Sequence, residues 1–158
     1  MTRQTVDDLR AYVNATKLPF VIKGVLSVTD ALKSVECGAR GILVSHHHGR
    51  MPFAIPPLMV LPAICEAVRD VEGFEVFVDS GIASGADVFK SLALGAKAVG
   101  VGRAMMPALL TDGTEGVVRC VTGMNQELKT LMGYTGCASL SEIRPELLWK
   151  DGKPMAAK

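Results

Sequence analysis

Four short apolar segments, separated by segments with helical character, constrain the fold of this chain most strongly. They are Pro19–Lys23, Gly41–Ser45, Glu75–Asp79 and Ala98–Val101. Each is rich in β-branched or aliphatic residues and lacks the alternation of a half-exposed strand, so we predict parallel strands covered on both faces. Each segment also ends in, or runs directly into, polar residues or glycine. Hydrophobic strands with reactive residues at their carboxyl ends are typical of α/β proteins.

The segments between these strands carry helix signals. Residues 31–42 resemble residues 90–99, because both read as a helix, then Gly-Ala and a basic residue, then a strand. Such stacked units, joined by right-handed crossovers, form either half of a (β/α)8 barrel or a small open sheet. The predicted helices cover 29–35 after a Ser27 or Thr29 cap, 58–68, 87–94 after Ser84 or Gly85, 115–132 and 140–143, with stops at Gly38 and Gly95.

Composition excludes several classes of protein. The chain has 158 residues, about one domain, and its 17 basic and 16 acidic residues give a net charge of +1, which argues against a nucleic-acid partner bound through bulk charge. No apolar run reaches the roughly 20 residues of a membrane span, and the polar N-terminus is not a signal peptide. The four cysteines are spread singly, so we expect free thiols in a cytoplasmic protein.

Two candidate site segments follow the first two strands. Lys23 either extends from a buried stem to solvent or directs its ammonium at an anionic ligand above the strand ends. Ser45–Arg50 contains three consecutive histidines. One of them is a candidate general base, because the unperturbed pKa of imidazole lies near about 6.5. Arg50 is a candidate clamp for a substrate carboxylate. A plain surface run of histidines is the alternative interpretation, and we expect no metal site, since three adjacent side chains on a loop cannot all face one ion.

A phosphate site is predicted after the last two strands. Gly81 and Gly85 follow the third strand, and Gly102 and Arg103 follow the fourth. Glycines there let backbone N–H groups approach a phosphate, and a helix N-terminus adds favourable partial charge. A phosphate between the last two loops is a recurrent arrangement in (β/α)8 barrels. The alternative is that the glycines only shape turns.

Taken in order, these motifs resemble the FMN-dependent α-hydroxy acid oxidases and dehydrogenases, such as glycolate oxidase, lactate oxidase and mandelate dehydrogenase. The resemblance spans about residues 8–148 and covers only strands 5–8 of that family's barrel. It implies a TIM-barrel-type fold, as a C-terminal half-barrel over residues 1–150 with a flexible tail over 151–158. The motifs that carry it are LPFVIKGV at 18–25, VSHHHGR at 44–50, FVDSGIASGADVFK at 77–90 and LGA through GR at 94–103.

The resemblance implies oxidation of a small 2-hydroxy acid to a 2-oxo acid with FMN as cofactor. His47 would be the catalytic base, Arg50 would bind the substrate carboxylate, and Asp79 would orient and stabilise protonated His47. Lys23 would stabilise the reduced flavin, and Ser45 would meet the flavin. The FMN-binding residues implied are Lys23, Ser45, Asp79, Gly81, Gly102 and Arg103.

Several positions depart from the family pattern. His46 and His48 stand where the family usually has Asn and Gly, and Ala83 replaces an Arg that contacts the cofactor. Residues 51–53 read Met-Pro-Phe in place of Gln-Leu-Asp. These changes indicate a divergent branch.

The family's N-terminal half, which carries further substrate and flavin contacts, has no counterpart in these 158 residues. A second hypothesis is therefore a catalytically incomplete fragment or split-enzyme subunit that binds FMN weakly or only with a partner half. Open sheet edges would drive association, either as a homo-oligomer or with a missing N-terminal half-barrel. We also expect the single tryptophan, Trp149, to pack the final segment down.

Overall fold

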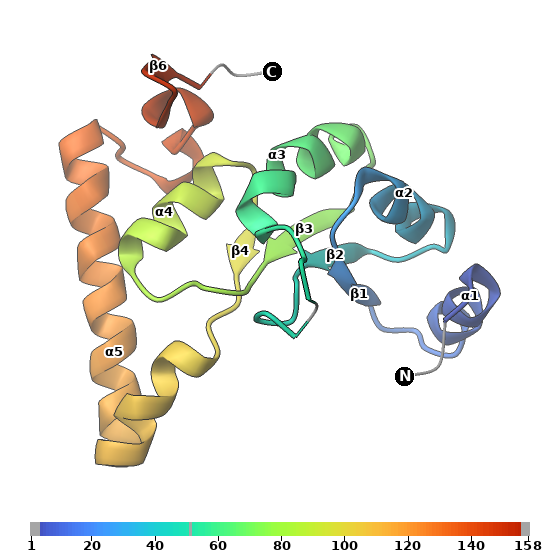
Figure 1. Ribbon diagram of the computed structural model, residues 1–158, viewed down its shortest axis with the longest axis horizontal. Helices are drawn as coiled ribbons and strands as arrows, with labels where there is room; N and C mark the ends of the chain where they lie inside the picture. Colours follow the sequence, from blue (N-terminus) through green and yellow to red (C-terminus); the bar gives the residue numbers. More distant parts are fainter. Residues whose placement is uncertain (1–3, 51, 156–158) are drawn as a thin grey trace.

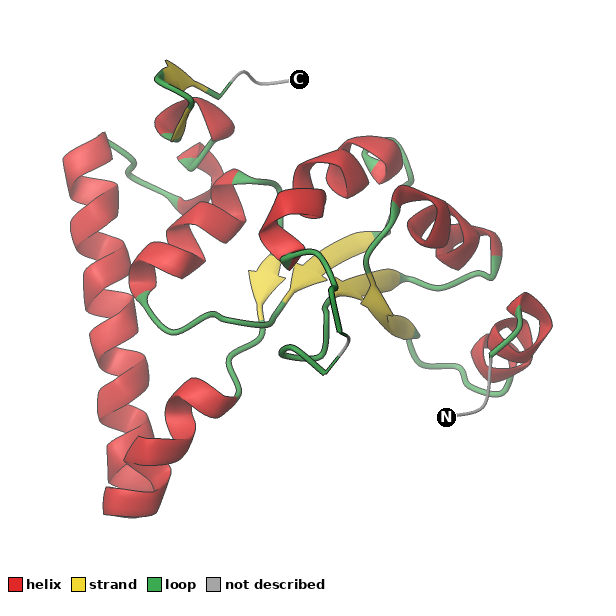
Figure 2. Cartoon of the chain, viewed as in Figure 1, coloured by secondary structure: helices red, strands yellow, loops and turns green. Residues whose placement is uncertain are grey.

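The computed structural model describes residues 4–50 and 52–155, which form an α/β arrangement of alternating strands and helices (Figures 1 and 2). All four predicted strands are present. The elements are α1 (Val6–Asn14), β1 (Val21–Val25), α2 (Val28–Glu36), β2 (Gly41–Val44), α3 (Pro57–Val68), β3 (Glu75–Val78), α4 (Gly85–Ala93), β4 (Ala98–Val99), η1 (Arg103–Met105), α5 (Met106–Thr135), η2 (Leu140–Glu142), η3 (Pro145–Leu147), β5 (Trp149–Lys150) and β6 (Lys153–Pro154).

The main sheet has the strand order β1-β2-β3-β4, and every neighbouring pair is parallel. Strand order therefore follows chain order without the reversal of a doubly wound sheet. Right-handed crossovers between strands placed in this order put the connecting helices on one side, and α2, α3 and α4 follow one another around the sheet in Figure 1. This is the winding of a (β/α)8 barrel rather than of an open two-sided sheet.

One face of the sheet packs against the helices to form the main core. Strand residues such as Ile42, Val44 and Val78 are fully buried there, beside Leu61 and Ile64 of α3. These side chains alternate with those of the other face, as the pleat of a strand requires.

The opposite face is the inner face, defined by the aligned row Lys23, Leu43, Phe77 and Ala98. Leu43 and Phe77 are only partly buried, and Lys23 and Ala98 are exposed. The prediction that both faces are covered is therefore wrong for the described residues. The physical reason is that such a face fills the interior of a closed barrel, whereas this sheet contains four strands.

Local signals set the helix ends as predicted. Ser27 and Ser84 are the N-caps of α2 and α4, and each side chain accepts a hydrogen bond from the backbone N–H three residues on. Gly38 and Gly95 follow the two helices with φ values of 85° and 103°, which glycine adopts without strain.

The C-terminal region differs more from the prediction. Helix α5 begins at Met106, well before the predicted start, and is interrupted by non-helical backbone at Asp112 and Gly113. It packs closely on α4, because a Cβ on Gly85 would meet the α5 backbone at Met124. In Figure 1 the two helices run side by side.

Trp149 is 70% exposed, so the expectation that it packs the final segment down is wrong. The segment is held instead by Ile143, Leu147 and Leu148, which lie against Phe89 of α4. In the predicted tail, β6 pairs with β5; residues 156–158 lie outside the described residues, and the flexible tail stays a prediction. Among the described residues, no helix has the length and apolarity needed to span a membrane.

Candidate functional site

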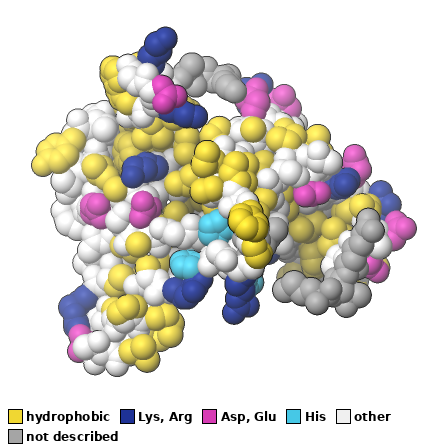
Figure 3. Space-filling view, in the orientation of Figure 1, with side chains coloured by type: hydrophobic (Ala, Val, Ile, Leu, Met, Phe, Trp, Pro, Cys, Tyr) yellow, Lys and Arg dark blue, Asp and Glu magenta, His cyan; other side chains and the backbone are white. Residues whose placement is uncertain are grey.

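The predicted site segments converge at the carboxyl ends of the four strands. They line a cavity of about 440 Å³, to which β1 contributes Lys23 and the loop after β2 contributes His47, His48 and Arg50. The loops after β3 and β4 contribute residues 79–82 and 100–104. Figure 3 shows histidine side chains beside Lys and Arg side chains near the middle of the view. Sequential parallel strands bring these loops together, because all their carboxyl ends lie at the same edge.

A hydrogen-bonded group of four side chains forms the floor of the site. The Lys23 ammonium donates to Ser45 Oγ at 2.8 Å and to Asp79 Oδ2 at 2.5 Å. The Ser80 hydroxyl donates to Asp79 Oδ1 at 2.8 Å and lies 3.4 Å from Ser45 Oγ. Both carboxylate oxygens of Asp79 therefore have a donor, and the orientation of the group is fixed by contacts from β1 and from its own loop.

Asp79 is ionised over a wider pH range than an ordinary aspartate. Partial burial by itself would raise the pKa of Asp79, but hydrogen bonds from Lys23, Ser45 and Ser80, together with the charge of Lys23, outweigh that effect and lower it. The site consequently holds a carboxylate and an ammonium as a charged pair. Among the described residues that line the cavity, Asp79 is the single acidic side chain, whereas Lys23, Arg50 and Arg103 are cationic.

The histidine loop, residues 45–50, has strained backbone. His47 and His48 both have φ near 55°, in the left-handed region that residues with a Cβ adopt at a cost of about 1 kcal/mol or more. Internal hydrogen bonds hold it in this shape: the His47 N–H donates to Ser45 Oγ at 3.1 Å and the Gly49 N–H to His46 Nδ1 at 3.0 Å. Such strain at a cluster of polar residues is typical of functional sites.

The His47 ring lies next to Arg50, with 3.3 Å between Nε2 and Nη1. A guanidinium can only donate, so a hydrogen bond in this contact requires Nε2 of His47 as the acceptor, which is the tautomer with the ring proton on Nδ1. This neutral tautomer is the form that a general base requires.

The contact expected between Asp79 and His47 is not among the hydrogen bonds of the described residues. Lys23 and Ser80 occupy the carboxylate instead, and the left-handed backbone of the loop directs His47 toward Arg50. The structure therefore brings both residues to the same cavity without pairing them.

The predicted phosphate site has open glycines and one well-held cation. A Cβ placed on Gly81, which has φ of 102°, or on Gly102 would meet nothing within 4 Å. Arg103 donates from Nη2 to the His48 carbonyl oxygen at 2.7 Å, which joins the loop after β4 to the histidine loop. The two glycines thus leave backbone exposed beside a guanidinium.

The N-terminus of α4 differs from the expectation that it adds its partial charge to the phosphate site. The Gly85 N–H donates to Glu127 Oε2 at 2.7 Å, and the Ala83 N–H donates to Asp87 Oδ2 at 3.1 Å. Two carboxylates of the chain itself already bind this helix end. Glu127 comes from α5, 42 residues away, so no local sequence signal could have indicated it.

The three consecutive histidines, considered above as metal ligands, do not form a ligand cluster in the described part of the chain. Within residues 4–50 and 52–155, no group of three His, Cys, Asp or Glu side chains is placed to hold a metal ion. All four cysteines are free thiols, as predicted.

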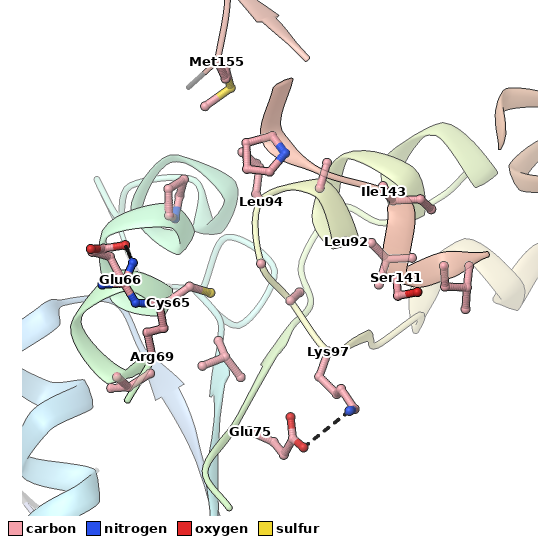
Figure 4. A pocket seen from close by; sticks show the side chains of 18 of the residues that line it. Cys65, Glu66, Arg69, Glu75, Leu92, Leu94, Lys97, Ser141, Ile143 and Met155 are labelled. Atoms are coloured by element: carbon pink, nitrogen blue, oxygen red, sulfur yellow. Dashed lines mark hydrogen bonds and ion pairs between the residues drawn. The ribbon is translucent and has the colours of Figure 1, made fainter. Parts of the chain in front are cut away.

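A second cavity, of about 740 Å³, lies at the amino ends of β3 and β4, away from the predicted site residues. Figure 4 shows Cys65 and Leu94 among its walls, with Glu75 paired to Lys97. Its walls come from α3, the α4–β4 connection and the C-terminal segment. It is larger than the candidate site, but none of the described residues that line it is a predicted catalytic, substrate-binding or FMN-binding residue.

Known proteins are similar in sequence to this chain over most of its length. The profile of the family described as FMN-dependent dehydrogenase matches residues 1–150. The chain is 41% identical over 145 residues to an L-lactate oxidase of Roseobacter sp. (strain GAI101), covering 91% of this chain and 39% of the relative. It is 44% identical over 144 residues to a 4-hydroxymandelate oxidase of Amycolatopsis orientalis, covering 90% of this chain and 39% of the relative. The chain thus spans about two fifths of the length of these curated relatives.

Solved structures with similar sequences superpose on this chain. A mandelate oxidase variant with a monooxide FMN adduct superposes with a TM-score of 0.85 at 43% identity, covering 91% of this chain and 46% of that one. A flavocytochrome b2 variant with pyruvate bound superposes with a TM-score of 0.86 at 36% identity, covering 91% of this chain and 38% of that one. The predicted half-barrel is confirmed, because the four parallel strands form part of a (β/α)8-type barrel. With the family profile matching nearly the whole chain, this protein belongs to the FMN-dependent dehydrogenases.

Proposed function

We propose that this chain carries the catalytic and phosphate-binding part of an FMN-dependent enzyme that oxidises small 2-hydroxy acids to 2-oxo acids. One observation carries the proposal: a general-base candidate, a carboxylate clamp, a charged Lys–Asp pair and a glycine-lined cationic pocket all surround one cavity at the strand ends. The names of the relatives, an L-lactate oxidase and a 4-hydroxymandelate oxidase, support the same substrate class.

The residues present fit FMN. Gly81 and Gly102 offer backbone beside open space that a Cβ would fill, and Arg103 supplies a positive charge on the same wall of the cavity, which suits a phosphate dianion. Lys23, Ser45 and Asp79 would lie nearer the flavin ring. When bound, the flavin would accept the hydride equivalent, two electrons together with the α-hydrogen, that leaves the substrate α-carbon.

On the substrate side, Arg50 and His47 act as a pair. Arg50 would hold the substrate carboxylate through two parallel hydrogen bonds. Arg50 Nη1 lies 3.3 Å from His47 Nε2; on clamping a 2-hydroxy acid, Arg50 would exchange this contact for the substrate carboxylate, and the freed lone pair of Nε2 would face the substrate α-hydroxyl. His47 would take that proton at Nε2 as the substrate is oxidised.

Lys23 and Asp79 would set the electrostatics of the site. Their contact keeps a positive charge next to the place where negative charge would develop, and charge placed in advance is commonly the largest catalytic effect. Once His47 is protonated, the described lining of the cavity would hold four cationic groups and a single carboxylate, so Asp79 would also stabilise the imidazolium through space.

A second candidate function has its own observation, the open sheet. Strands β1 and β4 are the sheet edges, and Val21, at the start of β1, is 43% exposed. Unpaired parallel strand edges beside a partly exposed inner face favour association. The chain would then be a half-barrel that needs a partner half both for firm FMN binding and for turnover. The partner would be either a second copy or a separate polypeptide with the remaining strands.

Absorbance and turnover test both functions. We expect the purified chain, mixed with FMN, to perturb the flavin spectrum and to oxidise L-lactate, glycolate or mandelate, and His47→Ala to abolish turnover while retaining the flavin. Light scattering of the same sample gives its oligomeric state. FMN binding and turnover by a monomer would exclude the partner-dependent function. If neither the monomer nor any assembly binds FMN, the proposed function is wrong.

A further inference from the structure

Ser80 stands out because its backbone is strained where a glycine would not be. It has φ of 74° and lies between Asp79 and Gly81, the latter with φ of 102°. A side chain at such a φ raises the free energy of the folded state, whereas glycine does not. A serine can persist there when its hydroxyl makes contacts that offset the strain.

The hydroxyl of Ser80 does make such contacts. It donates to Asp79 Oδ1 at 2.8 Å, accepts from the His48 N–H at 3.1 Å, and lies 3.4 Å from Ser45 Oγ. One atom therefore links the carboxylate at the end of β3 to the strained loop that carries His47. Ser80 itself is partly buried.

These contacts determine where both groups point. With Ser80 on Oδ1 and Lys23 on Oδ2, Asp79 has a single favoured orientation. The bond from the His48 N–H holds the residue directly after His47, so the loop keeps the left-handed backbone that turns the His47 ring toward Arg50.

We propose that Ser80 is a positioning residue, whose hydroxyl holds Asp79 on Lys23 and the histidine loop over the cavity, and so keeps His47 beside Arg50. This inference rests on the proposed function, because it gives Ser80 a part in the same site. Ser80 itself contributes no group to the reacting atoms.

Two variants separate the hydroxyl from the backbone strain. Ser80→Ala removes the hydroxyl and keeps the strained φ, whereas Ser80→Gly removes both and is expected to fold readily. The matched control is Ser84→Ala, in the same connection between β3 and α4. Ser84 caps α4 and bonds to Asp87, so its loss lowers stability without touching Asp79.

Nuclear magnetic resonance of the 158-residue chain gives readouts that do not depend on turnover. In both Ser80 variants we expect the titration midpoint of the Asp79 carboxyl to rise toward its ordinary value, and the His48 amide to lose its protection from hydrogen exchange. Ser84→Ala should change neither. The titratable and cationic groups that share the cavity, namely Lys23, His47, His48, Arg50 and Arg103, are the same in all variants.

Turnover with a 2-hydroxy acid then links the positioning to the reaction. We expect kcat to fall roughly tenfold in both Ser80 variants with little change in KM, the size of effect that one hydrogen bond to a charged group has. If Asp79 titrates as in the parent chain, or the His48 amide stays protected, the inference is wrong. If neither the parent chain nor any assembly of it binds FMN, the proposed function fails, while the two resonance readouts still decide whether Ser80 positions these groups.

Discussion

The carboxyl and amino ends of the same parallel sheet carry cavities of opposite character. At the carboxyl end, glycine loops, strained backbone and an excess of cations surround about 440 Å³. At the amino end, the larger cavity of about 740 Å³ has mostly apolar walls, and its charges are paired with each other, Glu66 with Arg69 at 3.0 Å and Glu75 with Lys97 at 3.5 Å.

Backbone strain follows the same division. Among the described residues, the non-glycines with positive φ are His47, His48, Phe53, Ser80 and Asp151, and four of these five lie in the loops after β2 and β3. The connections at the amino end turn on glycines such as Gly38 and Gly95 instead. Strain and unbalanced charge raise the free energy of the folded chain, and their concentration at one end indicates which cavity is the reactive one.

The largest expected effect is loss of turnover on replacing the base. His47→Ala should lower kcat roughly 10² to 10⁴-fold, the usual contribution of a general base, without releasing the flavin. His48→Ala is the matched control, because the described hydrogen bonds of His48 come from its backbone rather than its ring. Steady-state oxidation of a 2-hydroxy acid measures both, and equal losses in the two variants would contradict the assignment of the base.

The charged pair at the carboxyl end should make stability depend on pH. The pKa of Asp79 is lowered in the folded chain, since burial is outweighed by Lys23, Ser45 and Ser80. The stabilisation is therefore complete above the unfolded pKa of about 3.9 and disappears as pH falls through the folded pKa. We expect Asp79→Asn to unfold more easily than the parent at about pH 7, and the difference to vanish in strong acid. Urea unfolding at several pH values measures it.

A control variant tests whether this pH dependence of stability is specific to Asp79. Asp70→Asn removes a carboxylate whose side chain is 93% exposed and lies in the connection between α3 and β3, at the opposite end of the sheet. It should change the stability difference between neutral and acid pH far less than Asp79→Asn does. A difference for Asp79→Asn that persists unchanged at the lowest pH would mean that packing, rather than the charge of Asp79, stabilises the fold.

Two glycines at opposite ends of the sheet have nearly the same φ, so the same substitution can be compared at both ends. Gly81 has φ of 102° and open space around its missing Cβ, whereas Gly95 has φ of 103° and a Cβ there would lie 3.0 Å from the Cys65 side chain. Alanine at either position strains the backbone by about 1–2 kcal/mol. Gly95→Ala adds overpacking of about 1–3 kcal/mol, so it should destabilise the chain more than Gly81→Ala.

The same pair should have the reverse effect on the cofactor. Gly81→Ala places a methyl group where the phosphate is proposed to lie and should weaken FMN binding, while Gly95→Ala leaves that end of the sheet unchanged. Thermal unfolding without FMN and flavin titration measure the two properties. If both variants lose stability and FMN affinity in the same proportion, the two ends are not independent.

The parts of the fold that can be predicted from the sequence are those with a local signal. Apolar runs located the strands, and Ser27, Ser84 and the glycines that follow the helices located helix ends, because these depend on a few neighbouring residues. The motifs also identified the loops that meet at one cavity, since parallel strands bring their carboxyl ends together.

Contacts between side chains of elements that are distant in the sequence could not be predicted. The left-handed backbone of His47 and Ser80 cannot be inferred for residues other than glycine, so the choice of Lys23 rather than His47 as the partner of Asp79 was not predictable. The bond from Gly85 to Glu127 spans 42 residues. The position of Trp149 near the C-terminus predicts that it packs the final segment down, but Ile143, Leu147 and Leu148 supply this packing against α4 instead.

The smallest expected effect concerns Cys65 at the amino-end cavity. Burial raises the pKa of its thiol to about 11, so at about pH 8 the reactive thiolate should be scarcer by roughly 200-fold than for an ordinary cysteine with a pKa of about 8.5. Alkylation with iodoacetamide, followed by mass spectrometry of the Cys65 peptide, should be slow in the folded chain and fast in urea. FMN should not alter the rate, because the cofactor is proposed to bind at the other end of the sheet. Labelling of Cys65 as fast in the folded chain as in urea would mean that burial does not protect this thiol, and the contrast between a charged, strained end and an apolar end would not hold.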